Sequence, residues 1–207
     1  DDFTDALSAC KEEIRRSEEN NESEEHCKSH IKSFLQNSFY SDYYINTKDR
    51  IDLAVYRGKS ADSEVGVLLE TKKVSNKAEF PSITNLNKKA TQELLLYYLR
   101  ERVDNGNNNI KQLIATNGIE WFLFKGEDFY AHFFKNKKLV KEYESFRDGR
   151  KDSTNNELFY REIASKFIDE VQAELPFVYL DLNVIELDRL SDRKLNNLYK
   201  LFSPVQW

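Results

Sequence analysis

The pattern of hydrophobic and polar positions predicts two amphipathic helices at the start of the chain. The apolar face of the first helix, spaced three or four residues apart, is formed by Phe3, Leu7, Cys10 and Ile14. A polar stretch at 17–23 interrupts this pattern, and Ser23 is suited to cap a second helix. The apolar face of that helix is formed by Cys27, Ile31, Phe34 and Leu35.

Strand and helix patterns alternate after this helical opening. Apolar, β-branched segments predict strands at 43–46, 51–57 and 65–72. A long helix is expected over 88–102, and the Asn-rich turn at 104–109 ends it. A meander of hairpins follows, with strands predicted at 110–116, 120–125 and 129–133.

The last third of the chain is predicted to be mainly helical. Residues 141–156 are polar and indicate a loop or a frayed helix. The residues Phe159, Ile163, Phe167 and Val171 space an amphipathic helix that ends near Pro176, and Ser191 caps a final helix. The predicted order is helix, three strands, helix and further strands, followed by a helical tail. This order indicates an α/β domain with a mixed sheet.

The composition indicates one compact domain without a membrane span. The chain has 207 residues, 40% hydrophobic and 32% charged, and no apolar run approaches the ~20 residues that cross a bilayer. The N-terminus does not resemble a signal peptide, and Cys10 and Cys27 lack the spacing of a metal site. We therefore expect a cytoplasmic protein with two buried thiols. Because the sequence contains no methionine, we also expect it to be a piece of a longer chain.

Charged residues interrupt two of the predicted buried strands. Asp52 lies in Ile51-Asp52-Leu53-Ala54-Val55, and Glu70-Thr71-Lys72 ends the apolar run that starts at Val65. Because an unpaired buried carboxylate is costly, charges at such positions are usually paired or bind metal. Alternation along a strand places Glu70 and Lys72 on one side. Two carboxylates and an ammonium at one sheet end predict a site for Mg²⁺-assisted phosphodiester hydrolysis; a structural ion pair is the alternative.

Gln92 and Glu24 are further candidates for this site. Gln92 is in phase with the leucines of its helix, Leu95, Leu96 and Leu99, so its amide is expected to face inward. There it would orient a water or a phosphate; a helix-to-loop hydrogen bond is the alternative. Glu24 is in phase with the apolar face of the second helix, whereas Glu25 is rotated toward solvent. A charge favoured by the helix macrodipole is the alternative for Glu24.

These residues, taken in order, resemble the PD-(D/E)XK nuclease superfamily. Its core of helix, three strands, helix and strand carries an acidic residue in one strand, an acid-x-lysine motif in the next and a glutamine on the following helix. Three segments are similar to the N-terminal nuclease domain of type IIG restriction–modification enzymes: Glu24-Glu25-His26, Lys88-Lys89-Ala90-Thr91-Gln92-Glu93-Leu94 and Ala115-Thr116-Asn117-Gly118-Ile119-Glu120-Trp121. Two positions depart from the pattern: Ile51 replaces the proline before Asp52, and Leu96, not tyrosine, stands four residues after Gln92.

The resemblance implies a fold and a domain organisation. The fold is a restriction-endonuclease-like core, a mixed central sheet flanked by helices in the order α-β-β-β-α-β. Residues 1–207 would form a single nuclease domain, with the core at 22–140 and a C-terminal helical extension at 155–207. In type IIG enzymes a helical connector, an adenine-specific methyltransferase and a target-recognition region follow on the same chain.

The resemblance also implies residue roles. Asp52, Glu70 and the carbonyl of Thr71 would hold Mg²⁺, Lys72 would orient or help deprotonate the attacking water, and Gln92 and Glu24 would complete the site. Four lysines would contact phosphates of double-stranded DNA: Lys73, Lys77, Lys88 and Lys89. A solvated basic face is the alternative for them, and the net charge of −5 permits only a local basic surface.

Two other functions remain open at this point. One is the nuclease portion of a type I restriction subunit, whose motor motifs would lie downstream. The other is a non-catalytic, nuclease-like module that docks DNA or a partner subunit.

Overall fold

A single mixed sheet forms the centre of the molecule. The computed structural model describes residues 2–48 and 51–203, and six strands of this part pair in the order β1-β2-β3-β4-β5-β6. The strands are β1 (Ile45–Lys48), β2 (Ile51–Tyr56), β3 (Val65–Thr71), β4 (Gln112–Thr116), β5 (Glu120–Lys125) and β6 (Val178–Asp181). β3 and β4 run parallel, and the other neighbouring strands run antiparallel.

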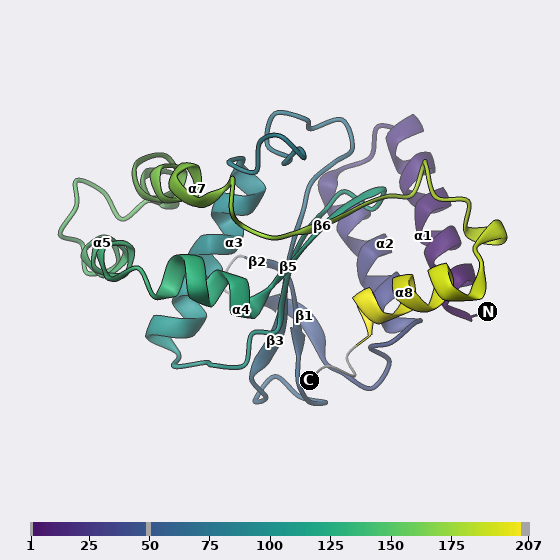
Figure 1. The fold of residues 1–207 in the computed structure, drawn as a ribbon, viewed down its shortest axis with the longest axis horizontal. Helices are drawn as coiled ribbons and strands as arrows, with labels where there is room; N and C mark the ends of the chain where they lie inside the picture. Colours follow the sequence, from purple (N-terminus) through teal and green to yellow (C-terminus); the bar gives the residue numbers. More distant parts are fainter. Residues whose placement is uncertain (1, 49–50, 204–207) are drawn as a thin grey trace.

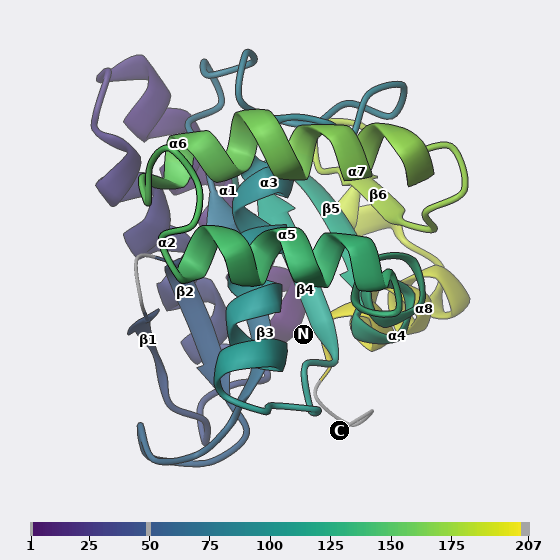
Figure 2. The ribbon, with the colours of Figure 1, turned by 90° about the vertical axis from the view of Figure 1, so that its left-hand side faces the viewer.

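Helices cover both faces of this sheet. One face carries α1, α2 and α8, and the other carries α3 and α4, with α5 and α7 in an outer layer beyond α3 (Figures 1 and 2). The helices are α1 (Asp2–Glu19), α2 (Glu24–Gln36), α3 (Lys89–Leu99), α4 (Gly126–Phe129), α5 (Lys137–Arg147), α6 (Asn156–Leu158), α7 (Ser165–Val171) and α8 (Asp192–Phe202). π-Helical segments extend α3 over Arg100–Asp104, extend α4 over Tyr130–Phe134, and join α6 to α7 over Phe159–Ala164.

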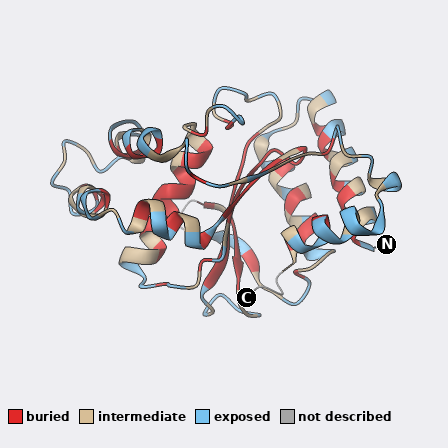
Figure 3. Ribbon diagram, viewed as in Figure 1, coloured by how far each residue is buried: buried red, intermediate tan, exposed pale blue. Residues whose placement is uncertain are grey.

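Each face of the sheet has its own hydrophobic core because side chains alternate along the strands. In β2, Leu53 and Val55 pack beneath α1 and α2, whereas Ala54 and Tyr56 pack beneath α3. Buried residues line the sheet and the inner sides of the helices (Figure 3). The predicted α/β class with a mixed sheet is therefore confirmed.

β3 is buried on both faces. Every one of its residues from Val65 to Thr71 is buried, including Glu70 and Thr71 at its end. A strand covered on both sides is typically a continuous apolar run rather than an alternating one. The run that starts at Val65 has this character, and it delivers Glu70 to the end of a central strand.

The strand predicted at 129–133 is wrong, because this segment is helical. It is formed by the end of α4 and the π-helical segment that follows. Phe129 and Phe133 are both fully buried, and their rings pack against each other with centroids 4.9 Å apart. Aromatic residues that recur at an interval of four follow the helical period, not the strand period.

The polar segment at 141–156, predicted as a loop or a frayed helix, is helical up to Arg147 and non-helical over 148–155. α5 reaches from Lys137 to Arg147 and buries Leu139, Tyr143 and Phe146 along one side. Asn136 caps it by accepting hydrogen bonds from the backbone N–H groups of Lys138 and Leu139. Three inward positions are sufficient to hold a helix whose other positions are polar.

The C-terminal segment belongs to the same packed body as the core. β6, which the sequence pattern did not predict, adds an edge strand beside β5. The predicted helix after Ser191 is present as α8, and its Phe202 packs against Phe34 and Trp121 on the face of the sheet. In the residues that the structure describes, none of the helices has the length and apolarity that crossing a membrane requires.

Candidate active site

Asp52 is fixed at the end of β3 by two hydrogen bonds. Its Oδ2 accepts one bond from the Thr71 backbone N–H at 2.9 Å and one from the Thr71 hydroxyl at 2.8 Å. The antiparallel register of β2 and β3 explains this contact. Leu53 lies opposite Leu69, so Asp52, one residue earlier in β2, lies beside the end of β3. On the other side, Nζ of Lys28 on α2 lies 3.8 Å from Asp52 Oδ1.

Glu70 and Lys72 form a buried ion pair. The distance from Lys72 Nζ to Glu70 Oε1 is 3.0 Å, and the two side chains are 5% and 4% exposed. Burial raises the pKa of Glu70 well above its ordinary range, Glu93 and Asp52 raise it further, and Lys72 offsets part of the effect. Burial alone would lower the pKa of Lys72, but Glu70 and Glu93 outweigh it and raise that pKa above its ordinary value. Lys72 therefore keeps its positive charge.

α3 contributes Glu93 to this site, where the sequence pattern predicted Gln92. Glu93 Oε2 lies 2.8 Å from Lys72 Nζ, in an ion pair that lacks the angles of a directed hydrogen bond. The amide of Gln92 instead donates to Asn87 Oδ1 at 2.9 Å, the helix-to-loop bond that was its alternative. We call the five side chains that meet here the carboxylate cluster: Glu24, Asp52, Glu70, Lys72 and Glu93.

The sequence does contain a pattern that indicates Glu93 as a site residue, although the spacing of the leucines along the helix favours Gln92. Of the eleven residues of α3, nine are buried, so its apolar positions do not define one inward face. However, Glu93 directly precedes three leucines at 94–96, and an acidic residue within an apolar segment is the same signal that identified Asp52. Counted from Glu93, a tyrosine does stand four residues later, at Tyr97.

Tyr97 and Tyr160 bond to each other beside the cluster. Burial raises the pKa of Tyr97 above its ordinary value, and the charges of Glu70 and Glu93 contribute to this rise. Burial likewise raises the pKa of Tyr160 to about 12. Both phenols are thus neutral at physiological pH and form an uncharged wall next to Glu93.

Glu24 reaches the carboxylate cluster from the first turn of α2. Its Oε2 accepts a hydrogen bond from the Lys73 backbone N–H at 3.3 Å, and its Oε1 lies 4.0 Å from Lys72 Nζ. Burial raises the pKa of Glu24, although Lys72 opposes this effect. The side chain is 40% exposed, so Glu24 lies on the open side of the cluster. Glu25 is 70% exposed, as predicted, and pairs with Lys28.

The four lysines predicted to contact DNA are largely engaged with other side chains. Lys77 pairs with Glu120 at 2.8 Å, and Lys89 pairs with Glu157 at 2.8 Å. Lys73 donates to Asn21 Oδ1 at 3.0 Å, while Lys88 makes no ion pair within the described ranges. Carboxylates therefore compensate the charges of Lys77 and Lys89, whereas Lys73 and Lys88 are the two of the four that would be left to contact phosphates.

The donor chemistry of the cluster suits a hard divalent cation. Its carboxylate oxygens are the ligands that Mg²⁺ prefers, and Glu70 Oε2 is buried with no hydrogen-bond partner among the residues described. The arrangement, in contrast, is that of an ion-pair network with Lys72 between Glu70 and Glu93. Within 2–48 and 51–203, no group of three or more His, Cys, Asp or Glu side chains is arranged to hold a metal ion.

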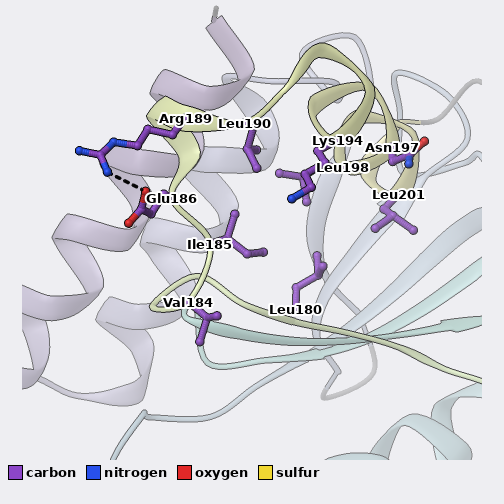
Figure 4. Close-up of a pocket in the computed structure, with 10 residues that line it drawn as sticks. All are labelled: Leu180, Val184, Ile185, Glu186, Arg189, Leu190, Lys194, Asn197, Leu198 and Leu201. Atoms are coloured by element: carbon purple, nitrogen blue, oxygen red, sulfur yellow. Dashed lines mark hydrogen bonds and ion pairs between the residues drawn. The ribbon is translucent and has the colours of Figure 1, made fainter.

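A cavity of about 490 Å³ lies away from this cluster, between α8 and the loop that follows β6 (Figure 4). Its lining is mostly aliphatic, with Leu180, Ile185 and Leu198 facing inward and the Glu186–Arg189 ion pair at its rim. None of the cluster residues lines it. Nothing in the structure shows what covers this cavity, and we assign it no ligand.

Comparison with known proteins identifies a family but no characterised relative. The model of a family described as a domain of unknown function, DUF7149, matches residues 1–207. No curated protein and no solved structure matches the chain. The chain belongs to the DUF7149 family.

Proposed function

We propose that this chain is the Mg²⁺-dependent DNA endonuclease domain of a type IIG restriction–modification enzyme. The observation that carries the proposal is the meeting of Asp52, Glu70 and Lys72 at one end of β3. Asp52 is fixed there by Thr71, and Glu70 is bonded to Lys72. These are the residue types and the strand positions expected of a PD-(D/E)XK site.

The element order supports the same proposal. α2, β1, β2, β3, α3 and β4 follow one another in the order α-β-β-β-α-β, around a mixed sheet. A helix that carries an acid, α2, and a helix that reaches the site from the crossover, α3, both approach the end of β3. We therefore assign the chain a restriction-endonuclease-like core with β5 and β6 added at the edge.

Two side chains of the cluster and one backbone carbonyl would hold the metal ion. Asp52 has its Oδ1 directed only toward Lys28 at 3.8 Å, Glu70 has its Oε2 unpartnered within the described chain, and the Thr71 carbonyl is the third donor implied by the resemblance. A divalent cation supplies charge neutralisation at the scissile phosphate and acidifies a water. Rigid backbone placement at the end of β3 keeps these donors in fixed positions.

Lys72 would stabilise the negative charge that develops on the phosphate. Its ammonium is held at the cluster by ion pairs with Glu70 and Glu93, so it lies close to the donors that would bind the metal ion. Glu24, on the open side of the cluster, would orient the attacking water or the Lys72 ammonium. Gln92 is bonded to Asn87, and we give it no catalytic role.

The test is cleavage of DNA by the full-length protein and its variants. Lys72→Ala is expected to slow cleavage by about 10²–10³-fold, because one preorganised stabiliser contributes roughly that much. Asp52→Asn is expected to be at least as severe, since it removes a metal ligand. Removing Lys72 leaves Glu70 and Glu93 without their shared partner, so a thermal unfolding curve and any methylation activity verify that each variant keeps its fold. Titration with Mg²⁺ separates weaker metal binding from slower chemistry.

The matched control is Lys59→Ala, which removes an 80% exposed lysine that pairs with Asp42. This variant should cut DNA at the wild-type rate. If Lys72→Ala cuts DNA equally fast, the site is not a nuclease centre, and the docking-module function replaces it. A helicase motif instead of a methyltransferase motif downstream on the polypeptide would indicate the type I alternative.

A further inference from the structure

Lys72 lies between two buried carboxylates that come from different elements. Its Nζ is 3.0 Å from Glu70 Oε1 on β3 and 2.8 Å from Glu93 Oε2 on α3. The side chains of Glu70, Lys72 and Glu93 are 4%, 5% and 11% exposed. One ammonium thus links the central strand to the helix of the crossover.

The cluster contains more carboxylates than ammonium groups. Its four carboxylates are Glu24, Asp52, Glu70 and Glu93, and within the described ranges the ammonium groups paired with them are Lys28 and Lys72. Lys28 is shared with Glu25, which reduces its effect on Asp52. Because excess negative charge is costly to bury, this environment favours a further positive charge, either a proton held by Glu70 and Glu93 or a bound cation that replaces it.

One buried carboxylate oxygen of Glu70 also indicates that the cluster can accept a further positive charge. Glu70 is 3% exposed, and its Oε2 is buried without a hydrogen-bond partner in the described part of the chain. Its other oxygen bonds to Lys72, so the unsatisfied atom lies within the cluster. Buried polar atoms nearly always have a hydrogen-bond partner, so this oxygen is available either to a proton shared with Glu93 or to a cation.

We infer that Glu93 is a third carboxylate ligand for the divalent cation, and that Lys72 is the internal counter-ion which this cation displaces from between Glu70 and Glu93. The inference rests on the proposed function and adds a residue and an exchange of cations to it. Glu24 offers the displaced ammonium a second partner, since its Oε1 is already 4.0 Å from Nζ on the open side.

A purely structural role for Glu93 makes a different prediction. If Glu93 only pairs with Lys72, its neutralisation changes stability but leaves metal affinity unchanged. Metal binding therefore separates the two roles without reference to cleavage. Mn²⁺ replaces Mg²⁺ as the probe, because its electron paramagnetic resonance signal reports the free ion directly.

The experiment measures Mn²⁺ binding by the full-length protein and four variants: Glu93→Gln, Lys72→Met, Asp52→Asn and Glu101→Gln. Glu93→Gln should weaken binding by about tenfold or more, as expected when a group that holds or orients a metal is altered. Lys72→Met should bind Mn²⁺ more tightly than the wild type, because the competing ammonium is gone. Mn²⁺ should also raise the melting temperature of Lys72→Met more than that of the wild type.

Glu101→Gln is the matched control. Glu101 is also a buried glutamate, on the π-helical continuation of α3, and it pairs with Lys48 at 2.6 Å away from the cluster. Its neutralisation should leave Mn²⁺ affinity unchanged. A thermal unfolding curve for each variant verifies that differences in binding do not reflect loss of the fold.

The outcomes separate this inference from the proposed function. If Asp52→Asn weakens Mn²⁺ binding and Glu93→Gln does not, Glu93 is not a ligand and the endonuclease proposal stands. If the wild type binds no Mn²⁺, both proposals fail. If Lys72→Met binds Mn²⁺ no more tightly than the wild type, the cation exchange is wrong. Should Lys72→Met not fold, Glu93→Gln still decides, because Lys72 keeps Glu70 as its partner.

Discussion

Asn117 and Gly118 form the turn between β4 and β5. Asn117 stabilises it by side-chain hydrogen bonds, and Gly118 by its backbone conformation. Asn117 is fully buried, and its Oδ1 accepts hydrogen bonds from the backbone N–H groups of Ile119 and Glu120. Gly118 has a φ of +86°, a conformation that other residues rarely adopt. A Cβ atom at Gly118 would lie 2.5 Å from Cγ1 of Ile14 on α1. This turn therefore also sets how closely α1 approaches the sheet.

Gly118→Ala is expected to destabilise the protein more than Gly106→Ala. Gly106 also has a positive φ, +63°, but a Cβ atom there meets nothing within 4 Å. Gly106→Ala should cost roughly 1–2 kcal/mol from backbone strain alone. Gly118→Ala should cost about 3 kcal/mol or more, since Ile14 is fully buried in the core and any shift of its side chain disturbs that packing.

Urea unfolding measures both changes in the free energy of unfolding. An Ile14→Ala background should reduce the extra cost of Gly118→Ala, because it removes the clashing side chain. Equal losses for the two glycine variants would contradict a role for the α1 contact.

Single residues were predictable where their chemistry conflicts with their surroundings. Asp52, Glu70 and Lys72 are charged groups within apolar segments, and the structure brings them to one sheet end. Glu93 satisfies the same criterion, but the helical phase of the leucines favoured Gln92. A helix that is buried nearly all round has no single inward face, so its phase cannot choose between adjacent residues.

Whole elements were predictable where their periodicity is simple. β2, β3, β4 and β5 lie at the predicted segments within one or two residues at each end. The helical segment at 129–133 was mistaken for a strand because short aromatic runs suit both structures. β6 has four residues that are partly or fully exposed, so it shows neither alternation nor an apolar run. Only its pairing with β5 makes it a strand.

α1 and α2 each bury one thiol, and these thiols give an element-scale prediction. Burial raises the pKa of Cys10 from 9.0 to about 12 and also raises that of Cys27. Because thiolates are the reactive form, neither cysteine of the folded protein should react with a disulfide reagent at pH 8. Both should react after denaturation, and rapid labelling of the native protein would show that the two helices do not pack as described.

The same shift predicts a loss of stability at high pH. Above pH 9 the unfolded chain releases the Cys10 proton, whereas the folded protein retains it up to about pH 12. The contribution of the protonated Cys10 thiol to the free energy of unfolding is therefore complete below pH 9. It declines as the pH rises, by up to about 1.4 kcal/mol per pH unit. Chemical denaturation of the wild type and Cys10→Ala between pH 8 and pH 10 measures it, and the variant should lose less stability over this range.

At the scale of the whole molecule, charge limits how this protein meets DNA. The net charge is −5, and Lys77 and Lys89 are paired with carboxylates. The 207-residue chain should therefore bind duplex DNA weakly and with little sequence preference, with dissociation constants of roughly 10⁻⁴–10⁻⁶ M at physiological salt. A salt titration of binding checks this expectation. Tight, sequence-selective binding that persists at high salt would place a recognition element within these residues.

The parallel pairing of β3 with β4 has a consequence for how the chain folds. β1, β2 and β3 can form by local hairpin steps, as can β4 and β5, but β3 reaches β4 only after the long connection through α3 closes. Such non-local closure is slow compared with hairpin formation. We therefore expect Asp52, Glu70 and Lys72 to come together on the local part of the sheet, and Glu93 to join them when the crossover closes. Completion of the cluster would then accompany the joining of the two halves of the sheet.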